Sequence, residues 1–520
     1  MGITPLDHNT GYVPEGWALT TLRVACEINP PKASKDSVTY DAPVSFVPMP
    51  AVDADEGAIT KPQIKRFSEV RKGFTSFRED DVIMAKITPC MENGKAAIAK
   101  NLMNGLGFGS TEFHVLRSTE AVRPEFVYHF IRQESYRRAA GDEMTGSVGQ
   151  KRVPQWFLEA TEVPLPPLSE QIRIVTRLTE LMTALKASHE HLSQVPLILK
   201  RFRQAVLAAA CSGRLTADWR EKHPEIKSMS LELERYDDSS SKVRTRRGVP
   251  DELECPNDLT GLGIPESWTL RSVASLLRLG ILRDVKDGNH GSNHPKTSEL
   301  GDYGLPFITA AQVKNYQIDY ESAPKVGGEA RKRLKVGFAE TGDVILTHKG
   351  TVGRAAVNMK PCVLTPQTTY YRCDSQVLNP AYLVYLFTSP LFYSQLAAVM
   401  SQTTRDFVPI SEQYRLFLVL APPEEQQEIS RRVDALFAFA DKVQQSLVGA
   451  KARVDRLTQS ILAKAFRGEL VPTEAELARR EGRDYEPASV LLERIKKERA
   501  SQVETTPNQR RSARKASDHV

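Results

Sequence analysis

The sequence repeats one pattern of motifs in its two halves and keeps the copies in register over a long stretch without gaps. From Glu170-Gln171, which recurs as Glu425-Gln426, a constant offset of 255 carries the match as far as Leu215 and Leu470. Earlier matches pair residues 13–17 with 264–268, Asp81-Val82-Ile83 with Asp343-Val344-Ile345, and Pro166-Pro167 with Pro422-Pro423. The region between these motifs differs in length between the copies. A rigid element thus keeps its register while the parts before it vary, and the chain has approximate two-fold symmetry.

The matched stretch has the apolar spacing of a coiled coil. From Ile174 and from Ile429, apolar residues recur in alternating steps of four and three over more than five heptads. The other reading, an amphipathic helix lying on its own domain, is usual for two or three turns only. Two helices with matching seams in one chain can pair antiparallel. The expected pairing core is Leu178, Leu181, Leu185, Leu192, Leu199, Phe202, Val433, Leu436, Val443, Leu447, Val454 and Leu457.

The ends of both helices carry recognisable signals. Each begins after its proline pair, with Ser169 or Glu424-Glu425 near the positive end. Gly213 and Gly468 stand where a left-handed residue would end the helix. Pro196 and Gly449 predict a kink or short break inside the helices. About 42 residues at ~1.5 Å each give a rod of roughly 60 Å.

The parts before the helices mix short strands with short helices. Strands are expected at 81–85, 113–116 and 343–347. Helices are expected at 126–132 and 382–388, opened by Pro124 and Pro380. The predicted fold class is α+β, with an internal pseudo-two-fold repeat.

Bulk properties set the remaining bounds. A chain of 520 residues suits two to four domains, and 41% hydrophobic with 26% charged residues is typical of a globular protein. The net charge of +6 permits a polyanionic partner without demanding one. Six scattered cysteines form no Cys-x-x-Cys pair, and no signal peptide or apolar run of ~18 residues is visible, so a cytoplasmic location is expected.

Several loops have residues suited to nucleic acid. Glycine allows close approach, lysine and arginine neutralise phosphates, and Asn, Gln, Thr and His read base edges. Similar loops also occur in proteins without this role. The candidate DNA-binding residues are Lys86, Thr88, Asn93, Lys95, Gln150, Lys151 and Arg152 in the first copy, and Asn289, His290, Lys349, Thr351, Arg354, Thr404 and Arg405 in the second. Lys151-Arg152 and Arg405 are expected at equivalent places, before Val153-Pro154 and Val408-Pro409.

No catalytic centre is identified. Asn29-Pro30-Pro31-Lys32 lacks the aromatic residue of the amino-methyltransferase motif, and a turn is the better reading. The glycine-rich 105–109 leads into a strand rather than a helix, and no P-loop motif occurs. His290 and His294 lack further ligands nearby in sequence, so no metal site is expected.

The assembled motifs resemble the DNA-specificity subunit of type I restriction-modification systems. The match runs from about residue 13 to 500. Its motifs are Val13-Pro14-Glu15-Gly16-Trp17, Gly73-Phe74, Asp80-Asp81-Val82-Ile83, 109–116, 163–167, Glu170-Gln171, their counterparts in the second half, Glu486-Pro487-Ala488-Ser489 and Leu491-Leu492-Glu493.

This resemblance implies two target-recognition domains, each reading one half of a split, asymmetric DNA sequence, with the helices as spacer. It implies a non-catalytic subunit on whose helices two adenine methyltransferase subunits dock, joined by restriction and translocase subunits. S-adenosylmethionine, ATP and magnesium would be used by those partners and not by this chain. The expected domains are 1–165 and 263–420 for recognition, 166–215 and 421–470 for the helical spacer, 216–262 for a polar linker, 471–506 for a partly helical extension and 507–520 for a disordered basic tail.

Two alternatives remain open from the sequence. The chain could be a stand-alone two-headed DNA-binding regulator without an associated enzyme, or an enzyme sufficient in itself. Neighbouring genes would separate the first alternative from a restriction-modification subunit. Removal of Lys151 and Arg152 is expected to weaken DNA binding in a salt-dependent way without changing sequence preference.

Overall fold

The computed structural model describes residues 13–32, 38–54, 56–147, 149–237, 249–250, 253–256, 259, 261, 263–402 and 406–497. The chain divides into two compact units. The first comprises residues 1–192 and 449–520, and the second comprises residues 193–448. Among the described residues, no helix is both long and apolar enough to span a membrane.

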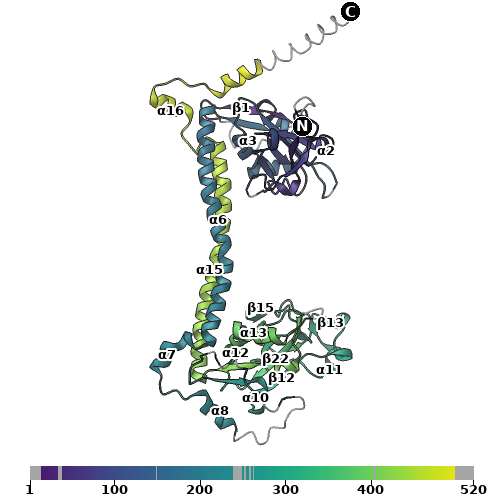
Figure 1. The fold of residues 1–520 in the computed structure, drawn as a ribbon, viewed down its shortest axis with the longest axis vertical. Coiled ribbons are helices and arrows are strands. Elements are labelled where there is room, and N and C mark those ends of the chain that lie inside the picture. Colours follow the sequence, from purple (N-terminus) through teal and green to yellow (C-terminus); the bar gives the residue numbers. More distant parts are fainter. Residues whose placement is uncertain are drawn as a thin grey trace, which may run out of the picture. The chain divides into compact units, whose positions relative to one another are not determined.

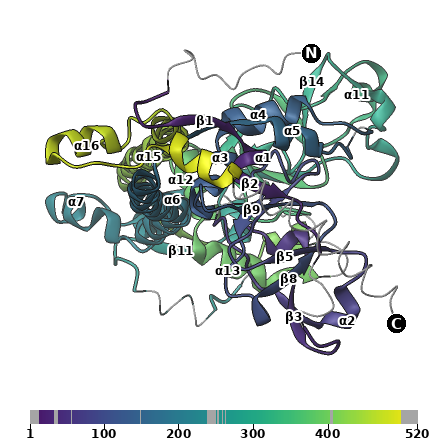
Figure 2. The ribbon, with the colours of Figure 1, turned by 90° about the horizontal axis from the view of Figure 1, so that it is seen from above.

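Two long helices, α6 (Leu168–Cys211) and α15 (Pro423–Phe466), cross the boundary between these units. In the first unit, Ile174 and Leu178 near the start of α6 share a core with Leu462 and Phe466 near the end of α15. In the second unit the other ends meet, with Val206 packing in the same core as Val433. The helices therefore pair antiparallel, as the heptad pattern predicts, and both views show them side by side (Figures 1 and 2).

Neither helix is interrupted. Each runs through 44 residues, and α6 continues past Pro196 as α15 continues past Gly449. The expected short break is therefore wrong at both positions. Pro196 is exposed. Gly213 and Gly468, both with φ of 75°, follow the last helical turns as expected.

The seam is buried unevenly. Leu178, Leu199, Val433 and Leu447 are buried. Leu181, Leu185, Leu192, Phe202, Leu436, Val443 and Val454 are half-buried, which is what a seam between two helices without a third layer produces. Leu457 is 50% exposed, so its placement in the pairing core is wrong. An α-helix drifts by about 20° per heptad from a strict 3.5-residue repeat. Near the C-terminal end of α15, Ile461, Leu462 and Ala465 therefore pack in the hydrophobic core of the first unit in place of Leu457.

The first module is built from two four-stranded sheets. One has the order β2-β9-β6-β7 and the other the order β4-β3-β8-β5, in which β3 and β8 are parallel. The strands are β2 (Cys26–Ile28), β9 (Phe113–Ser118), β6 (Val82–Ala85), β7 (Ala96–Ile98), β4 (Gln63–Arg66), β3 (Pro43–Val47), β8 (Leu106–Gly109) and β5 (Thr75–Arg78). The other elements are the pair β1 (Ala18–Thr21) and β10 (Glu162–Leu165), with α1 (Leu22–Ala25), α2 (Phe67–Val70), α3 (Pro124–Ile131), α4 (Glu134–Asp142) and α5 (Gln155–Ala160).

The second module repeats this topology. Its sheets have the orders β12-β22-β19-β20 and β13-β17-β14-β21-β18, and β14 and β21 are again parallel. The strands are β12 (Leu282–Asp287), β22 (Thr368–Cys373), β19 (Val344–Thr347), β20 (Ala355–Val357), β13 (Leu300–Gly301), β17 (Lys325–Val326), β14 (Leu305–Ile308), β21 (Cys362–Leu364) and β18 (Phe338–Ala339). The remaining elements are β11 (Thr269–Ser272), β25 (Phe417–Leu420), β15 (Val313–Lys314), β16 (Gln317–Ile318), β23 (Ser401–Gln402), β24 (Asp406–Phe407), α10 (Val273–Arg278), α11 (Gly328–Arg333), α12 (Pro380–Phe387), α13 (Pro390–Val399) and α14 (Ile410–Gln413). The predicted α+β class, the internal repeat and the predicted strands and helices are confirmed.

The repeated motifs anchor each long helix to a module. Trp17 Nε1 donates to Glu170 Oε1 at 2.8 Å, and Trp268 Nε1 donates to Glu425 Oε2 at 2.7 Å. Gln171 donates to the carbonyls of Ala121 and Pro166, and Gln426 donates to those of Val377 and Ala421. Buried polar groups must be paired. The Trp, Glu and Gln residues of the repeated motifs therefore hold each module on its long helix. Their role is structural and does not require chemistry on a substrate.

The segments that follow the two long helices are also equivalent. The predicted linker 216–262 contains α7 (Ala217–Lys222) and α8 (Met229–Asp237), so the description of this segment as a linker is incomplete. After α15 come α16 (Glu474–Glu481) and a helical stretch at 488–497. Met229 N donates to Ser267 O and Ala488 N donates to Gly16 O, so each segment closes over the first motif of the module in its own unit. The tail 507–520 lies outside the described residues.

Candidate nucleic-acid interface

In the first module, two candidate loops form one surface. The loop after β6 pairs with the segment before α5 through a bridge between Ile87 and Arg152. Thr88 N donates to Lys151 O at 3.0 Å, and Val153 N donates to Lys86 O at 2.8 Å. Lys86, Thr88, Lys151 and Arg152, separated by some 60 residues in sequence, are therefore brought together.

The second module builds the corresponding surface with the same backbone contacts. The loop after β19 pairs with β24 through a bridge between Lys349 and Phe407. Val408 N donates to His348 O at 2.9 Å, which matches the bond from Val153 to Lys86. This register makes Phe407, and not Arg405, the counterpart of Arg152, which corrects the expected equivalence. Thr404 and Arg405 lie outside the described residues.

Arg152 is held by a carboxylate in the first module. Its Nε and Nη2 donate to the two oxygens of Glu112 at 2.8 and 2.9 Å, and Nη1 donates to Gln150 O. The Arg152 guanidinium lowers the pKa of the Glu112 carboxyl. Because Glu112 compensates the charge of Arg152, we assign Arg152 the role of fixing the loop. The side chains exposed at the surface of this loop are those of Gln150 and Lys151.

The other candidates of the first module differ in accessibility. Lys95 Nζ donates to the Met49 carbonyl at 3.3 Å, so its ammonium group stabilises the adjacent backbone segment at Met49. Thr88 Oγ1 lies 3.3 Å from Lys151 O. Asn93 is exposed at the turn that precedes β7. Asn93 therefore has a side chain available to a ligand, whereas Lys95 is engaged.

Asn289 in the second module cannot read a base in this structure. It is 1% exposed, its Oδ1 accepts from Lys335 N and Val336 N at 2.8 and 3.2 Å, and its Nδ2 donates to Val336 O. Its amide oxygen and its amide nitrogen are thus both bonded to backbone. The interpretation of Asn289 as a base reader is wrong because the sequence does not reveal this burial.

The remaining candidates of the second module lie at or near the surface. Exposed His290 bonds Asp287 Oδ2 through Nε2 at 2.7 Å. Lys349 is exposed, with Nζ 5.4 Å from the centre of the Phe407 ring. Thr351 is half-buried and Arg354 is exposed, with Nη1 3.4 Å from Val313 O. The loop therefore presents cations beside an aromatic ring, where the first module has an arginine–carboxylate pair.

Two buried histidines, neither of them among the candidate residues predicted from the sequence, shape these surfaces. His114 Nε2 lies 2.9 Å from Val153 O, and His348 Nδ1 lies 3.0 Å from Val408 O. Burial lowers the pKa of both imidazoles and favours their neutral forms. The only sequence signal was the shared Val-Pro that each histidine contacts.

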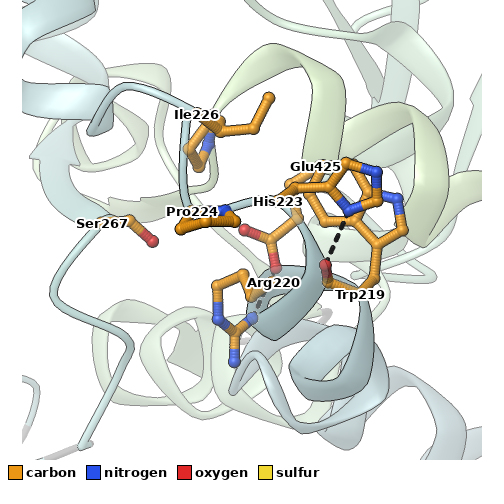
Figure 3. A pocket seen from close by; sticks show the side chains of 8 residues that line it. Trp219, Arg220, His223, Pro224, Ile226, Ser267 and Glu425 are labelled. Atoms are coloured by element: carbon orange, nitrogen blue, oxygen red, sulfur yellow. Dashed lines mark hydrogen bonds and ion pairs between the residues drawn. The ribbon is translucent and has the colours of Figure 1, made fainter.

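A small cavity of about 130 Å³ lies at the anchor of α15 (Figure 3). Trp219 stacks on His223 with ring centres 4.2 Å apart, and Arg220 and Thr216 donate to Glu425. This cavity belongs to the closure of the α7 segment over Trp268. Among the described residues, no group of three or more His, Cys, Asp or Glu side chains is arranged to hold a metal ion.

Known proteins share this architecture. Over 89% of this chain and 100% of the other, the fold matches a chain solved for complex assembly and conformational transition of the type I R-M system, with a TM-score of 0.64 and 21% identity. Over 89% and 99%, it matches the HsdS subunit from Thermoanaerobacter tengcongensis, with a TM-score of 0.55 and 20% identity. Both likenesses support a fold with two modules and paired helices.

Sequence comparison defines the family. Residues 14–196 match the type I restriction modification DNA specificity domain. The chain is 30% identical to the EcoBI specificity subunit of Escherichia coli over 69% of this chain and 68% of that protein. It is 41% identical to the EcoAI specificity subunit of the same species, over 33% of this chain and 29% of that protein. The chain belongs to the family of type I restriction enzyme specificity subunits, and a stand-alone regulator is not favoured.

Proposed function

We propose that this chain selects the DNA sequence on which a type I restriction-modification complex acts. Each module reads one half of a bipartite target through the loop after β6 or β19 and the segment before α5 or α14. The two halves differ in sequence, and the gap between them is not read. The paired helices set the length of that gap.

The observation that carries this proposal is that the two modules share a backbone framework but differ in the side chains at their candidate surfaces. The modules share the strand order of one four-stranded sheet, their other sheets differ only by the additional strand β13, and the backbone bonds at the candidate loop are the same. At matched positions, however, the first module has Arg152 bound to Glu112, whereas the second has Phe407 beside Lys349. Different side chains on one frame favour recognition of different bases.

The chemistry in this proposal belongs to partner subunits. Two adenine methyltransferase subunits would dock on the helices, and restriction and translocase subunits would join them. S-adenosylmethionine, ATP and magnesium would bind those partners, while this chain would bind DNA and catalyse nothing. The complex would act in the cytoplasm, together with its DNA.

The test is to exchange the modules. A chimera in which another family member's first module replaces residues 18–165 should methylate a site with one half changed and the other half retained. Purified wild-type chain with its methyltransferase is the reference. A chimera that changes both halves, or neither, would show that recognition is not divided between the modules.

A further inference from the structure

The second module has a basic segment that lies outside the candidate loops. It comprises the end of α11 and the residues after it, and its cations are Arg331, Lys332, Arg333 and Lys335. Arg333 is compensated by Glu299, to which it donates twice at 3.0 and 2.7 Å. Lys332 pairs with Glu329 at 2.7 Å. Arg331 and Lys335 are exposed, and no residue of the described chain forms an ion pair with either.

Buried Asn289 ties this segment to the candidate loop. Its three bonds to the backbone of Lys335 and Val336 fix the basic segment beside residues 287–290. The two backbones are so close that a Cβ on Gly337 would lie 2.8 Å from Gly288 Cα. Lys335 is therefore held next to the strand end that bears His290.

The same surface continues to Lys349. His348 is buried beneath this region, and burial lowers its pKa, against the hydrogen bond to the Val408 carbonyl, which raises it. Asp287, His290 and Lys349 also act on the pKa of this imidazole, so they lie around it. Lys335 and Lys349 are therefore both tied to residues 287–290, Lys335 through Asn289 and Lys349 through its neighbour His348.

The first module has an equivalent basic segment. Its short helix α2 lies between β4 and β5, as α11 lies between β17 and β18. Arg71 and Lys72 follow α2, and the Arg71 guanidinium lies 5.1 Å from the centre of the Tyr40 ring. Both helices lie on the side of their module that faces away from the long helices (Figure 1). The recurrence in parts that otherwise diverge in sequence indicates a shared partner.

We propose that Arg331 and Lys335 contact the sugar-phosphate backbone of the DNA duplex beside the bases read by the loops, and that Asn289 positions them. The inference rests on the proposed function and adds residues to its site. Exposed Arg and Lys side chains suit phosphates, and contacts to phosphates fix orientation and carry no sequence information. Arg71 and Lys72 would have this role in the first module.

The test compares double variants of the full chain bound to its methyltransferase. The probes are a duplex carrying the sequence found methylated in cells and a duplex of equal length with that sequence scrambled. Arg331→Ala/Lys335→Ala should bind both probes more weakly and lower the slope of log affinity against log salt by about 1.8, at ~0.9 per lost phosphate contact. Lys222→Ala/Lys227→Ala removes two exposed charges from the segment after α6 and should leave that slope unchanged.

The outcomes of this test distinguish a failure of the proposed function from a failure of this inference. Failure of the wild-type complex to prefer the methylated sequence would overturn the proposed function. Normal preference with an unchanged slope in Arg331→Ala/Lys335→Ala would overturn this inference alone, as would loss of methyltransferase from that variant with DNA binding intact. Asn289→Ala should lower the affinity for both probes and keep the preferred sequence, whereas a changed preference would make Asn289 a base reader.

Discussion

Individual side chains at the candidate interface divide into those that hold loops and those that face a ligand. Arg152 and Lys151 are neighbours, but only Arg152 is engaged by a carboxylate, Glu112. Lys95 and Asn289 are likewise bound to backbone carbonyls or amides. A charged or amide side chain in a glycine-rich loop is therefore not sufficient evidence for a contact with nucleic acid.

Separate substitution of Lys151 and Arg152 should distinguish these roles. Lys151→Ala is expected to lower the salt slope of DNA binding by about 0.9, through loss of one phosphate contact, and to leave stability unchanged. Arg152→Ala should lower the free energy of unfolding, because it removes the bidentate pair with Glu112. Salt-dependent binding and urea unfolding measure the two effects. Equal loss of stability in both variants would contradict the division.

The buried histidines predict how stability depends on pH. His114 and His348 have pKa values lowered by burial, so the unfolded chain binds a proton more readily than the folded one. Stability is then complete above the unfolded pKa of ~6.5 and falls below it by up to ~1.4 kcal/mol per pH unit for each histidine, until the folded pKa is reached. Urea unfolding at pH 7.5 and 5.5 tests this. His348→Gln should reduce the difference between the two values, and an undiminished difference would exclude His348 as a source.

The long helices depend on anchors that link elements far apart in sequence. Glu425 is 1% exposed and accepts bonds from Trp268, Thr216 and Arg220, so it joins α15 to the first strand of the module and to α7. Glu170 joins α6 to Trp17 and accepts a bond from the backbone of Glu474. Each anchor thus connects a module, a long helix and the segment that closes over both.

Removal of one indole donor should weaken such an anchor. Trp268→Phe leaves a buried carboxylate oxygen of Glu425 without its indole partner and should cost about 1.5–3 kcal/mol, the range for a hydrogen bond to a charged group. Trp17→Phe should have a similar effect through Glu170. Trp156→Phe is the matched control, because Trp156 is 48% exposed. Thermal or urea unfolding of the three variants gives the comparison, and equal stability of Trp268→Phe and Trp156→Phe would contradict the anchor.

Elements with regular periodicity could be predicted from the sequence, and elements held by distant contacts could not. The seam of α6 and α15, the strands β6, β9 and β19, and the proline-initiated α3 and α12 follow from apolar spacing and helix-start signals. The helices α7 and α8 are short and polar and are fixed by contacts with residues such as Ser267 and Glu425. Pro196 was expected to kink or break α6, but the helix continues past it.

The candidate site was only partly predictable for the same reason. The sequence identified the loops containing Lys86, Lys151 and Lys349, which the structure joins to their neighbouring segments. It did not show that Asn289 is buried, that Glu112 engages Arg152 or that Phe407 lies against Lys349. These facts depend on strand register between distant segments. Arg331 and Lys335 were also missed, because α11 and the residues after it have no motif.

At the scale of the whole chain, the gap between the two half-sites should be fixed. Both helices continue through Pro196 and Gly449, so neither is broken at the positions where a break was expected. One additional base pair would shift the second half-site by ~3.4 Å and rotate it by ~35°. Targets with the gap lengthened or shortened by one base pair should therefore bind at least tenfold more weakly, about 1.4 kcal/mol or more. Equal affinity across the three spacings would contradict a fixed spacer.

The central claim is that two unlike reading surfaces on one repeated frame specify two unlike half-sites. Its most direct test is a comparison of genome-wide adenine methylation in cells with and without this chain, its methyltransferase being present in both. The expected motif appears only with the chain and has two short, different half-sites separated by a gap of constant length and unrestricted sequence. A single contiguous palindrome, or the same methylation pattern in both cell lines, would contradict the account.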